Sequence, residues 1–249
     1  MSAFLSSFRP GRFVAGLGAI AALGLIATLL VGGYFENAPF ALLAPAPARA
    51  SPSPPLAAVY WSGDMGMRVG IGEGLVDDLA ASGVPVLTVS SPMLFAAARD
   101  RAFVDAAVAR SVAEAIARTH ARRVAVIGSS FGADIVATGI GTLPPALRRR
   151  VASVVLLVPG ATVYFHANPT GLFYRGRGAA EPVHTVPLLR GLPVTCIYGA
   201  DETDSLCPSP LMAGARRVRI EDGHLMLWSR DRLGQAMREA VLAPPPPMS

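Results

Sequence analysis

A serine between two glycines stands where an apolar, β-branched segment gives way to a helical one. Residues 128–132 read Gly-Ser-Ser-Phe-Gly and match the pattern G-x-S-x-G. In this pattern a sharp strand-to-helix turn lifts the middle serine above the sheet, and the glycines let the backbone segments pass closely. The sequence therefore predicts Ser130 as a nucleophile, and a purely structural glycine-serine turn is the alternative.

A serine hydroxyl needs a base to accept its proton and an acid to orient that base, and in this type of site they follow the serine in the order acid, then histidine. His224, after a strand predicted over 218–220, is the expected base. Asp204 is the preferred acid because it stands four residues before a proline, as acids in this loop commonly do. Asp201, closer to the end of the strand predicted over 194–198, is the alternative. Whichever aspartate is not the acid would cap the loop or pair with an arginine.

A tetrahedral intermediate needs two backbone N–H donors for its oxyanion. Phe131 supplies the first, and Asp64 or Met65, in the turn that begins at Gly63, supplies the second; a tight connection is the alternative for that turn. Asp134 lies in the first turn of the nucleophile helix, where the positive helix end stabilises a carboxylate. The functional alternative is that Asp134 and Gly63 contact the substrate, with Asp134 facing a cationic group.

Strands alternate with helical segments along most of the chain. The predicted strands cover residues 56–61, 84–89, 124–127, 151–158, 194–198 and 218–220, and the predicted helices cover 74–81, 100–119, a segment from about 133, and 230–242. Near-continuous apolar strands between helices indicate a mostly parallel sheet covered on both faces, a three-layer α/β architecture. Residues 159–193, rich in proline and glycine, are expected to form a partly ordered lid or a pocket wall.

The N-terminal segment predicts export. Arg9 and Arg12 precede the uncharged run 13–35, which as a helix is long enough to span a hydrocarbon core of about 30 Å, and this charge bias places the bulk of the chain outside the cytoplasm. Ala48, Arg49 and Ala50 form a small-x-small pattern that resembles a signal-peptidase site with cleavage after Ala50, so the run is either a cleaved signal peptide or a retained hydrophobic membrane anchor.

The expected organisation follows from these boundaries. Residues 1–35 form the leader or anchor, 36–55 a linker rich in proline and alanine, 56–243 the α/β domain, and 244–249 a disordered proline-rich tail.

The composition excludes several classes. A chain with 52% hydrophobic and 16% charged residues is not disordered, and a net charge of +5 is too small to argue for nucleic-acid binding. The four histidines show no zinc-ligand spacing, and the predicted chemistry needs no cofactor. The only two cysteines, Cys196 and Cys207, would meet an oxidising compartment after export, which favours a disulfide over two free thiols.

Four strings together resemble a bacterial virulence-protein family, VirJ/AcvB, over about residues 56–242. They are YWSGD at 60–64, GSSFGAD at 128–134, LPPALR at 143–148 and CIYGADETDSLCP at 196–208. The resemblance implies an exported α/β-hydrolase fold with Ser130 as nucleophile, Asp204 as acid and His224 as base, and it supports the cysteine bridge. The family tends to have SGDGGW and GHHF where this chain has SGDMGM and GHLM, so the oxyanion turn and the pocket beside the histidine are altered.

The resemblance also suggests a function. VirJ is associated with type IV secretion, and AcvB with hydrolysis of lysyl-phosphatidylglycerol in the periplasm. We therefore expect a serine ester hydrolase on the periplasmic side of the inner membrane, acting on a lipid or small ester such as aminoacyl-phosphatidylglycerol. The alternatives are a non-catalytic envelope or secretion-associated protein and a generic carboxylesterase or thioesterase.

Overall fold

The computed structural model describes residues 10–46, 49, 51–69, 72–168, 174 and 176–249. One seven-stranded sheet with the order β1-β3-β2-β4-β5-β6-β7 forms the centre of the molecule. The strands are β1 (Phe40–Leu43), β2 (Leu56–Trp61), β3 (Val86–Val89), β4 (Arg123–Ser129), β5 (Val151–Leu157), β6 (Val194–Gly199) and β7 (Arg216–Ile220). All neighbouring pairs are parallel except β1 and β3.

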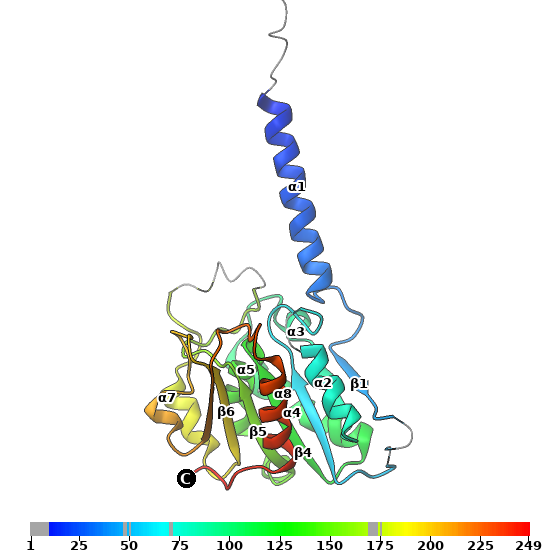
Figure 1. The fold of residues 1–249 in the computed structure, drawn as a ribbon, viewed down its shortest axis with the longest axis vertical. Helices are drawn as coiled ribbons and strands as arrows, with labels where there is room; N and C mark the ends of the chain where they lie inside the picture. Colours follow the sequence, from blue (N-terminus) through cyan, green and yellow to red (C-terminus); the bar gives the residue numbers. More distant parts are fainter. Residues whose placement is uncertain (1–9, 47–48, 50, 70–71, 169–173, 175) are drawn as a thin grey trace, which may run out of the picture.

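Helices cover both faces of the sheet, which confirms the predicted three-layer α/β class (Figure 1). Leu75 of α2 and Leu233 of α8 belong to the apolar cluster on one face, whereas Val104 of α4 and Ile135 of α5 belong to the cluster on the other. The helices are α1 (Pro10–Val31), α2 (Gly72–Ala81), α3 (Ser91–Phe95), α4 (Arg101–Thr119), α5 (Phe131–Gly139), α6 (Pro145–Arg148), α7 (Pro182–Thr185) and α8 (Arg230–Leu242), with short 3₁₀ turns η2 (Ile140–Thr142), η3 (Val186–Leu189) and η4 (Pro210–Met212).

The central strands form where the sequence is continuously apolar. All seven residues of β5 are buried, as expected for a parallel strand with helices on both faces. β3 starts two residues later than predicted because Pro85 has no N–H to donate, although its carbonyl accepts a hydrogen bond from Ala58 N at 2.9 Å.

A strand lies within the segment expected to be a linker. Residues 40–43 form β1, which pairs antiparallel with β3 from Phe40 opposite Val89 to Leu43 opposite Val86. The Phe40 side chain is buried in the core. The short apolar run between alanine- and proline-rich stretches was too brief to predict a strand, but pairing with the edge of a formed sheet supplies its hydrogen bonds.

The C-terminal tail corrects another expectation. The residues after α8 were expected to be disordered, yet Met248 is only 5% exposed and belongs to a core cluster. Its backbone also pairs with the loop before β6, since Met248 N donates to Leu192 O at 2.7 Å and Gly191 N donates to Met248 O at 2.8 Å. One apolar side chain and two hydrogen bonds therefore fix the end of a proline-rich segment.

The N-terminal helix α1 extends away from the end of the sheet at which the parallel strands finish (Figure 1). Among the residues that the structure describes, no helix has both the length and the hydropathy of a membrane span. Directly after α1 the chain reaches the loop behind β2, where Tyr34 Oη donates to Asp64 O at 3.1 Å. Ala48 and Ala50 of the expected cleavage site lie outside the described residues.

The segment expected to be a lid or pocket wall packs against the domain where it is described. Val163 and Phe165 are buried, and Val163 forms an isolated β-bridge with Ala180. The segment then forms α7 and η3 before it enters β6. Residues 169–173 and 175 lie outside the described residues.

Candidate active site

Ser130 occupies a strained turn between β4 and α5. Its φ of 50° and ψ of −122° lie outside the region that non-glycine residues usually adopt. The backbone segments around this turn pass each other very closely. A Cβ on Gly128 would stand 2.4 Å from Gly132 O, and one on Gly132 would stand 2.4 Å from Ser62 O. The two glycines of the sequence pattern are therefore required by the backbone, and they lift the Ser130 hydroxyl above the carboxyl edge of the sheet.

His224 contacts the serine as the sequence predicts. It lies in the loop after β7, and its Nε2 is 2.8 Å from Ser130 Oγ. The imidazole is 46% exposed and lines the cavity in front of Ser130. The predicted nucleophile and base are thus within hydrogen-bond distance, although they are 94 residues apart in the chain.

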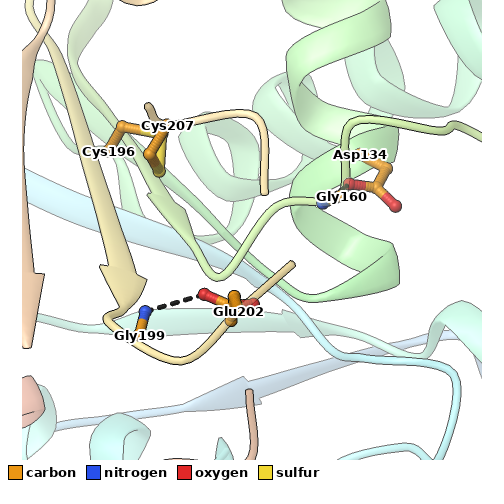
Figure 2. Close-up of a disulfide and its surroundings, with 6 residues drawn as sticks. All are labelled: Asp134, Gly160, Cys196, Gly199, Glu202 and Cys207. Carbon is orange, nitrogen blue, oxygen red and sulfur yellow. Dashed lines mark hydrogen bonds between the residues drawn. A yellow bond between two sulfur atoms is a disulfide. The ribbon is translucent and has the colours of Figure 1, made fainter. Parts of the chain in front are cut away.

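The acid beside His224 is Glu202, which corrects the sequence assignment. Glu202 Oε1 is 2.6 Å from His224 Nδ1, and the Glu202 side chain is only 3% exposed. Its second oxygen, Oε2, accepts a hydrogen bond from the backbone N–H of Gly199 at 2.7 Å (Figure 2). The carboxylate is thereby held from two directions and fixes the orientation and tautomer of the imidazole.

Neither predicted aspartate makes this contact. Asp204 and Asp201 are in the same loop as Glu202 and line the cavity in front of Ser130, but no hydrogen bond joins either side chain to His224. Glutamate reaches the histidine because its extra methylene lets the carboxylate fold back to the end of β6. The observable signal was the spacing, since Glu202 stands three residues after Gly199, whose N–H it accepts.

The two predicted oxyanion segments both adjoin the nucleophile. Phe131 is the first residue of α5, and the N–H groups of a first helical turn have no intrahelical acceptor. The turn that follows β2 in the chain also lies close to the nucleophile, since a Cβ on Gly63 would stand 3.7 Å from Ser130 Cβ. Asp64 and Met65, the two candidates for the second donor, also line the cavity beside Ser130.

The cavity in front of Ser130 is strongly acidic. Its volume is about 550 Å³, and carboxylates from three separate parts of the chain line it. They are Asp64, Asp134, Asp201, Glu202 and Asp204. Tyr164 and Tyr174 form an aromatic wall, with ring centroids 5.0 Å apart. No arginine or other permanent cation is among the residues that line this cavity in the described part of the chain.

Asp134 is a buried acid of this cavity. It is only 9% exposed, and its Oδ1 accepts a hydrogen bond from Gly160 N at 2.8 Å (Figure 2). Burial raises the pKa of Asp134 well above its ordinary value; the Gly160 N–H acts in the opposite direction, and the neighbouring Asp204 and Asp64 raise the pKa further. Burial therefore disfavours the ionised form of Asp134, and a cation bound in the cavity would stabilise that form.

Asp64 is held by a tyrosine of the same cavity. Tyr174 Oη donates to Asp64 Oδ2 at 2.9 Å, while Asn168 N donates to Tyr174 Oη at 2.9 Å. Burial raises the pKa of Asp64, and the hydrogen bond from Tyr174 lowers it in part. This chain of contacts fixes the carboxylate of the oxyanion turn against the aromatic wall.

The two cysteines are joined in the structure. Cys196 in β6 and Cys207 form a disulfide with a Cα–Cα distance of 5.5 Å (Figure 2). The bridge closes the loop that carries Glu202, and Leu206 N in the same loop donates to Pro159 O at 3.0 Å. The loop that supplies the acid is therefore tied to the sheet at both of its ends.

This arrangement is suited to nucleophilic catalysis. A serine hydroxyl, an imidazole and a buried carboxylate form one continuous chain of hydrogen bonds, which is the geometry that activates serine for attack on a carbonyl carbon. The described residues hold no group of three or more histidine, cysteine, aspartate and glutamate side chains arranged to bind a metal ion.

The chain has the α/β-hydrolase fold, and solved structures of this fold superpose on most of it. Est1E from Butyrivibrio proteoclasticus with bound ferulic acid has a TM-score of 0.58 and 13% identity, over 82% of this chain and 93% of that chain. A thioesterase domain from the curacin biosynthetic pathway has a TM-score of 0.53 and 13% identity, over 80% and 94%. The esterase domain of a Rhodothermus marinus protein has a TM-score of 0.55 and 14% identity, over 81% and 91%.

The family model described as "Bacterial virulence protein (VirJ)" matches residues 56–242. This chain therefore belongs to the VirJ family, as the four sequence strings indicated. The matched residues run from the start of β2 to the end of α8 and contain Ser130, Glu202 and His224. No curated protein matches the sequence.

Proposed function

We propose that this protein is a serine hydrolase that cleaves an ester whose acyl part carries a positive charge. The observation that carries the proposal is the hydrogen-bonded chain from Ser130 Oγ through His224 to Glu202. A protein that only binds partners has no need for a strained serine turn with a base and a buried acid in line behind it.

In the proposed reaction, Ser130 Oγ attacks the ester carbonyl while His224 Nε2 accepts the hydroxyl proton. Glu202 stabilises the imidazolium that forms, and the N–H of Phe131 with one from the turn behind β2 holds the oxyanion. His224 then gives its proton to the departing alcohol as the carbon–oxygen bond breaks. A water molecule, deprotonated by His224, attacks the acyl-serine and releases the acid.

The acidic cavity supports a cationic acyl group. Five carboxylates line the same cavity as the nucleophile, and an ammonium group bound there would offset the cost of holding Asp134 in its buried position. Aminoacyl esters, and lysyl esters above all, place a positive charge a few bonds from the carbonyl. With the resemblance to AcvB, this favours aminoacyl-phosphatidylglycerol as the substrate class.

The site of action in this proposal is the periplasmic side of the inner membrane. The uncharged run 13–35 behind Arg9 and Arg12 supports export, and the cysteine bridge suits an oxidising compartment. The packing of β1 and Tyr34 on the domain favours a retained N-terminal segment over cleavage after Ala50.

The test uses the full chain reconstituted in phospholipid vesicles that contain lysyl-phosphatidylglycerol. We expect release of free lysine by the parent protein and labelling of the parent by a serine-directed phosphonate, with neither result for Ser130→Ala. Labelling without lysine release would retain the hydrolase and replace the substrate. A folded parent protein that is neither labelled nor active would leave a non-catalytic envelope protein as the better account.

Asp134→Asn is expected to change substrate selection. The Michaelis constant for a lysyl ester should rise about tenfold, as for other lost charge contacts, while that for an uncharged acyl ester stays near the parent value. Since burial raises the Asp134 pKa, the parent should bind the cationic ester more tightly as the pH rises through that pKa and the carboxylate forms. Steady-state kinetics across pH with both esters, in parent and variant, measure this difference, and an equal rise for both esters would contradict it.

A further inference from the structure

Three large apolar side chains stand in solvent next to the catalytic histidine. Trp228 is 90% exposed, Leu225 59% and Leu227 53%. All three belong to the loop between β7 and α8, directly after His224. We call Leu225, Leu227 and Trp228 the apolar rim. Such a concentration of exposed apolar area beside a site is typical of a surface that binds another apolar surface.

The exposure of the rim follows from how its loop is fixed. Asp222 accepts hydrogen bonds from Gly223 N at 2.7 Å and from Trp228 N at 2.8 Å, so one carboxylate closes the loop. Between them Met226 is fully buried in the core and takes a φ of 48°. Because the Met226 side chain is buried and hydrogen bonds fix both ends of the loop, the side chains of Leu225 and Leu227 on either side of it face the solvent.

The rim continues into the site. Leu225 also lines a second, smaller cavity of about 120 Å³, which Ser130 and His224 line as well. Gly66 lines the same cavity, and the chain leaving α1 packs so closely on Gly66 that a Cβ there would stand 2.3 Å from Gly32 O. Ser130 thus lines both the acidic cavity and this smaller cavity, which Leu225 of the apolar rim also lines.

The charges around the rim complement an anionic surface. Arg230 and Arg232, in the first turn of α8, are exposed, and among the described residues neither forms an ion pair, although the exposed Asp231 lies between them. Tryptophan and leucine beside arginine are the side chains that enter the interface of a bilayer with acidic headgroups. The helix α1 also leaves the domain at this end of the sheet (Figure 1).

We propose that the apolar rim is a docking surface for an anionic lipid bilayer, so that the smaller cavity beside Ser130 faces the membrane. This inference rests on the proposed function for its purpose, since it lets the alcohol part of a lipid ester enter from the bilayer while the cationic part reaches the acidic cavity. Docking itself does not depend on hydrolysis, and the two are measured separately.

The first experiment measures tryptophan fluorescence of the full chain reconstituted in vesicles of phosphatidylglycerol and phosphatidylcholine. The chain has two tryptophans, and Trp61 is fully buried whereas Trp228 is exposed. We expect lipids brominated in the acyl chain to quench the tryptophan fluorescence of the parent. They should have little effect on the fluorescence of Trp228→Phe, whose remaining tryptophan emission comes from Trp61. Equal quenching of parent and Trp228→Phe, or none in either, would overturn the proposal.

The second experiment compares the rates of hydrolysis of two esters by the parent and by two variants. For Leu227→Ser/Trp228→Ser we expect the rate on a vesicle-borne ester, relative to that on a water-soluble ester, to fall about tenfold. Leu242→Ser, an equally exposed leucine at the other end of α8, is the matched control and should keep the parent ratio. An unchanged ratio in the double variant would contradict docking. If the parent hydrolyses neither ester, the proposed function fails, and the quenching result alone decides the docking surface.

Discussion

Glu202→Gln is expected to lower kcat about 10⁴-fold, which is the scale on which the orienting acid contributes to a serine–histidine–acid site. The amide has nearly the same shape as the carboxylate, so the loop should stay in place. It carries no charge to stabilise the imidazolium, and its NH₂ group can turn toward His224 Nδ1 and favour the wrong tautomer. Steady-state hydrolysis of a soluble ester by parent and variant measures the effect.

Asp204→Asn is the matched control for this experiment. Asp204 lies two residues away in the same loop and lines the same cavity, but it does not contact the histidine. We expect kcat on an uncharged ester to remain within a few-fold of the parent value, because only the charge of the cavity changes. A larger loss for Asp204→Asn than for Glu202→Gln would show that the acid changes place in the working enzyme.

Gly132→Ala is expected to destabilise the domain by about 4 kcal/mol or more, an effect at the upper end of those seen for single substitutions. Its Cβ would stand 2.4 Å from Ser62 O and 2.5 Å from Trp61 O, which are backbone atoms that cannot rotate away. Either β2 or the start of α5 would have to move, and both are buried in the core. Urea unfolding followed by circular dichroism measures the loss.

Gly74→Ala is the control for the backbone effect of replacing a glycine. Gly74 lies on the exposed side of α2, and a Cβ there meets no atom within 4 Å. Alanine in a helix interior is favoured over glycine by about 0.5–1 kcal/mol, so this variant should be at least as stable as the parent. If Gly132→Ala unfolded at the same urea concentration as Gly74→Ala, the prediction would be wrong, and the turn between β4 and α5 would have room for a Cβ.

Much of the fold was predictable because its strands carry local signals. β2, β4 and β5 are apolar runs bounded by turn residues, and burial on both faces makes each run nearly continuous. β1 and the Met248 tail were missed, since each is held by a few contacts to segments far away in the chain. A four-residue strand and a single buried methionine are too short to show a periodic pattern of apolar residues.

The site divides in the same way. Ser130 was found because the turn demands glycines on both sides, and His224 because its loop follows the last strand. The acid was assigned wrongly since three carboxylates within four residues, Asp201, Glu202 and Asp204, all fit the chain order. Only the spacing of three residues from Gly199, whose N–H it accepts, sets Glu202 apart in the sequence, and the path of the loop that makes this contact becomes visible only in three dimensions.

The pairing of β1 with β3 has a consequence for proteolytic maturation. Cleavage after Ala50 would remove β1 together with Phe40 and Tyr34, and β3 would become the border of a six-stranded sheet. The unpaired N–H and C=O groups of β3, flanked by its apolar side chains, would then offer a template for the strand of another molecule. A processed form would be prone to self-association, so an expression plan for the isolated domain should keep the residues from Tyr34 onward.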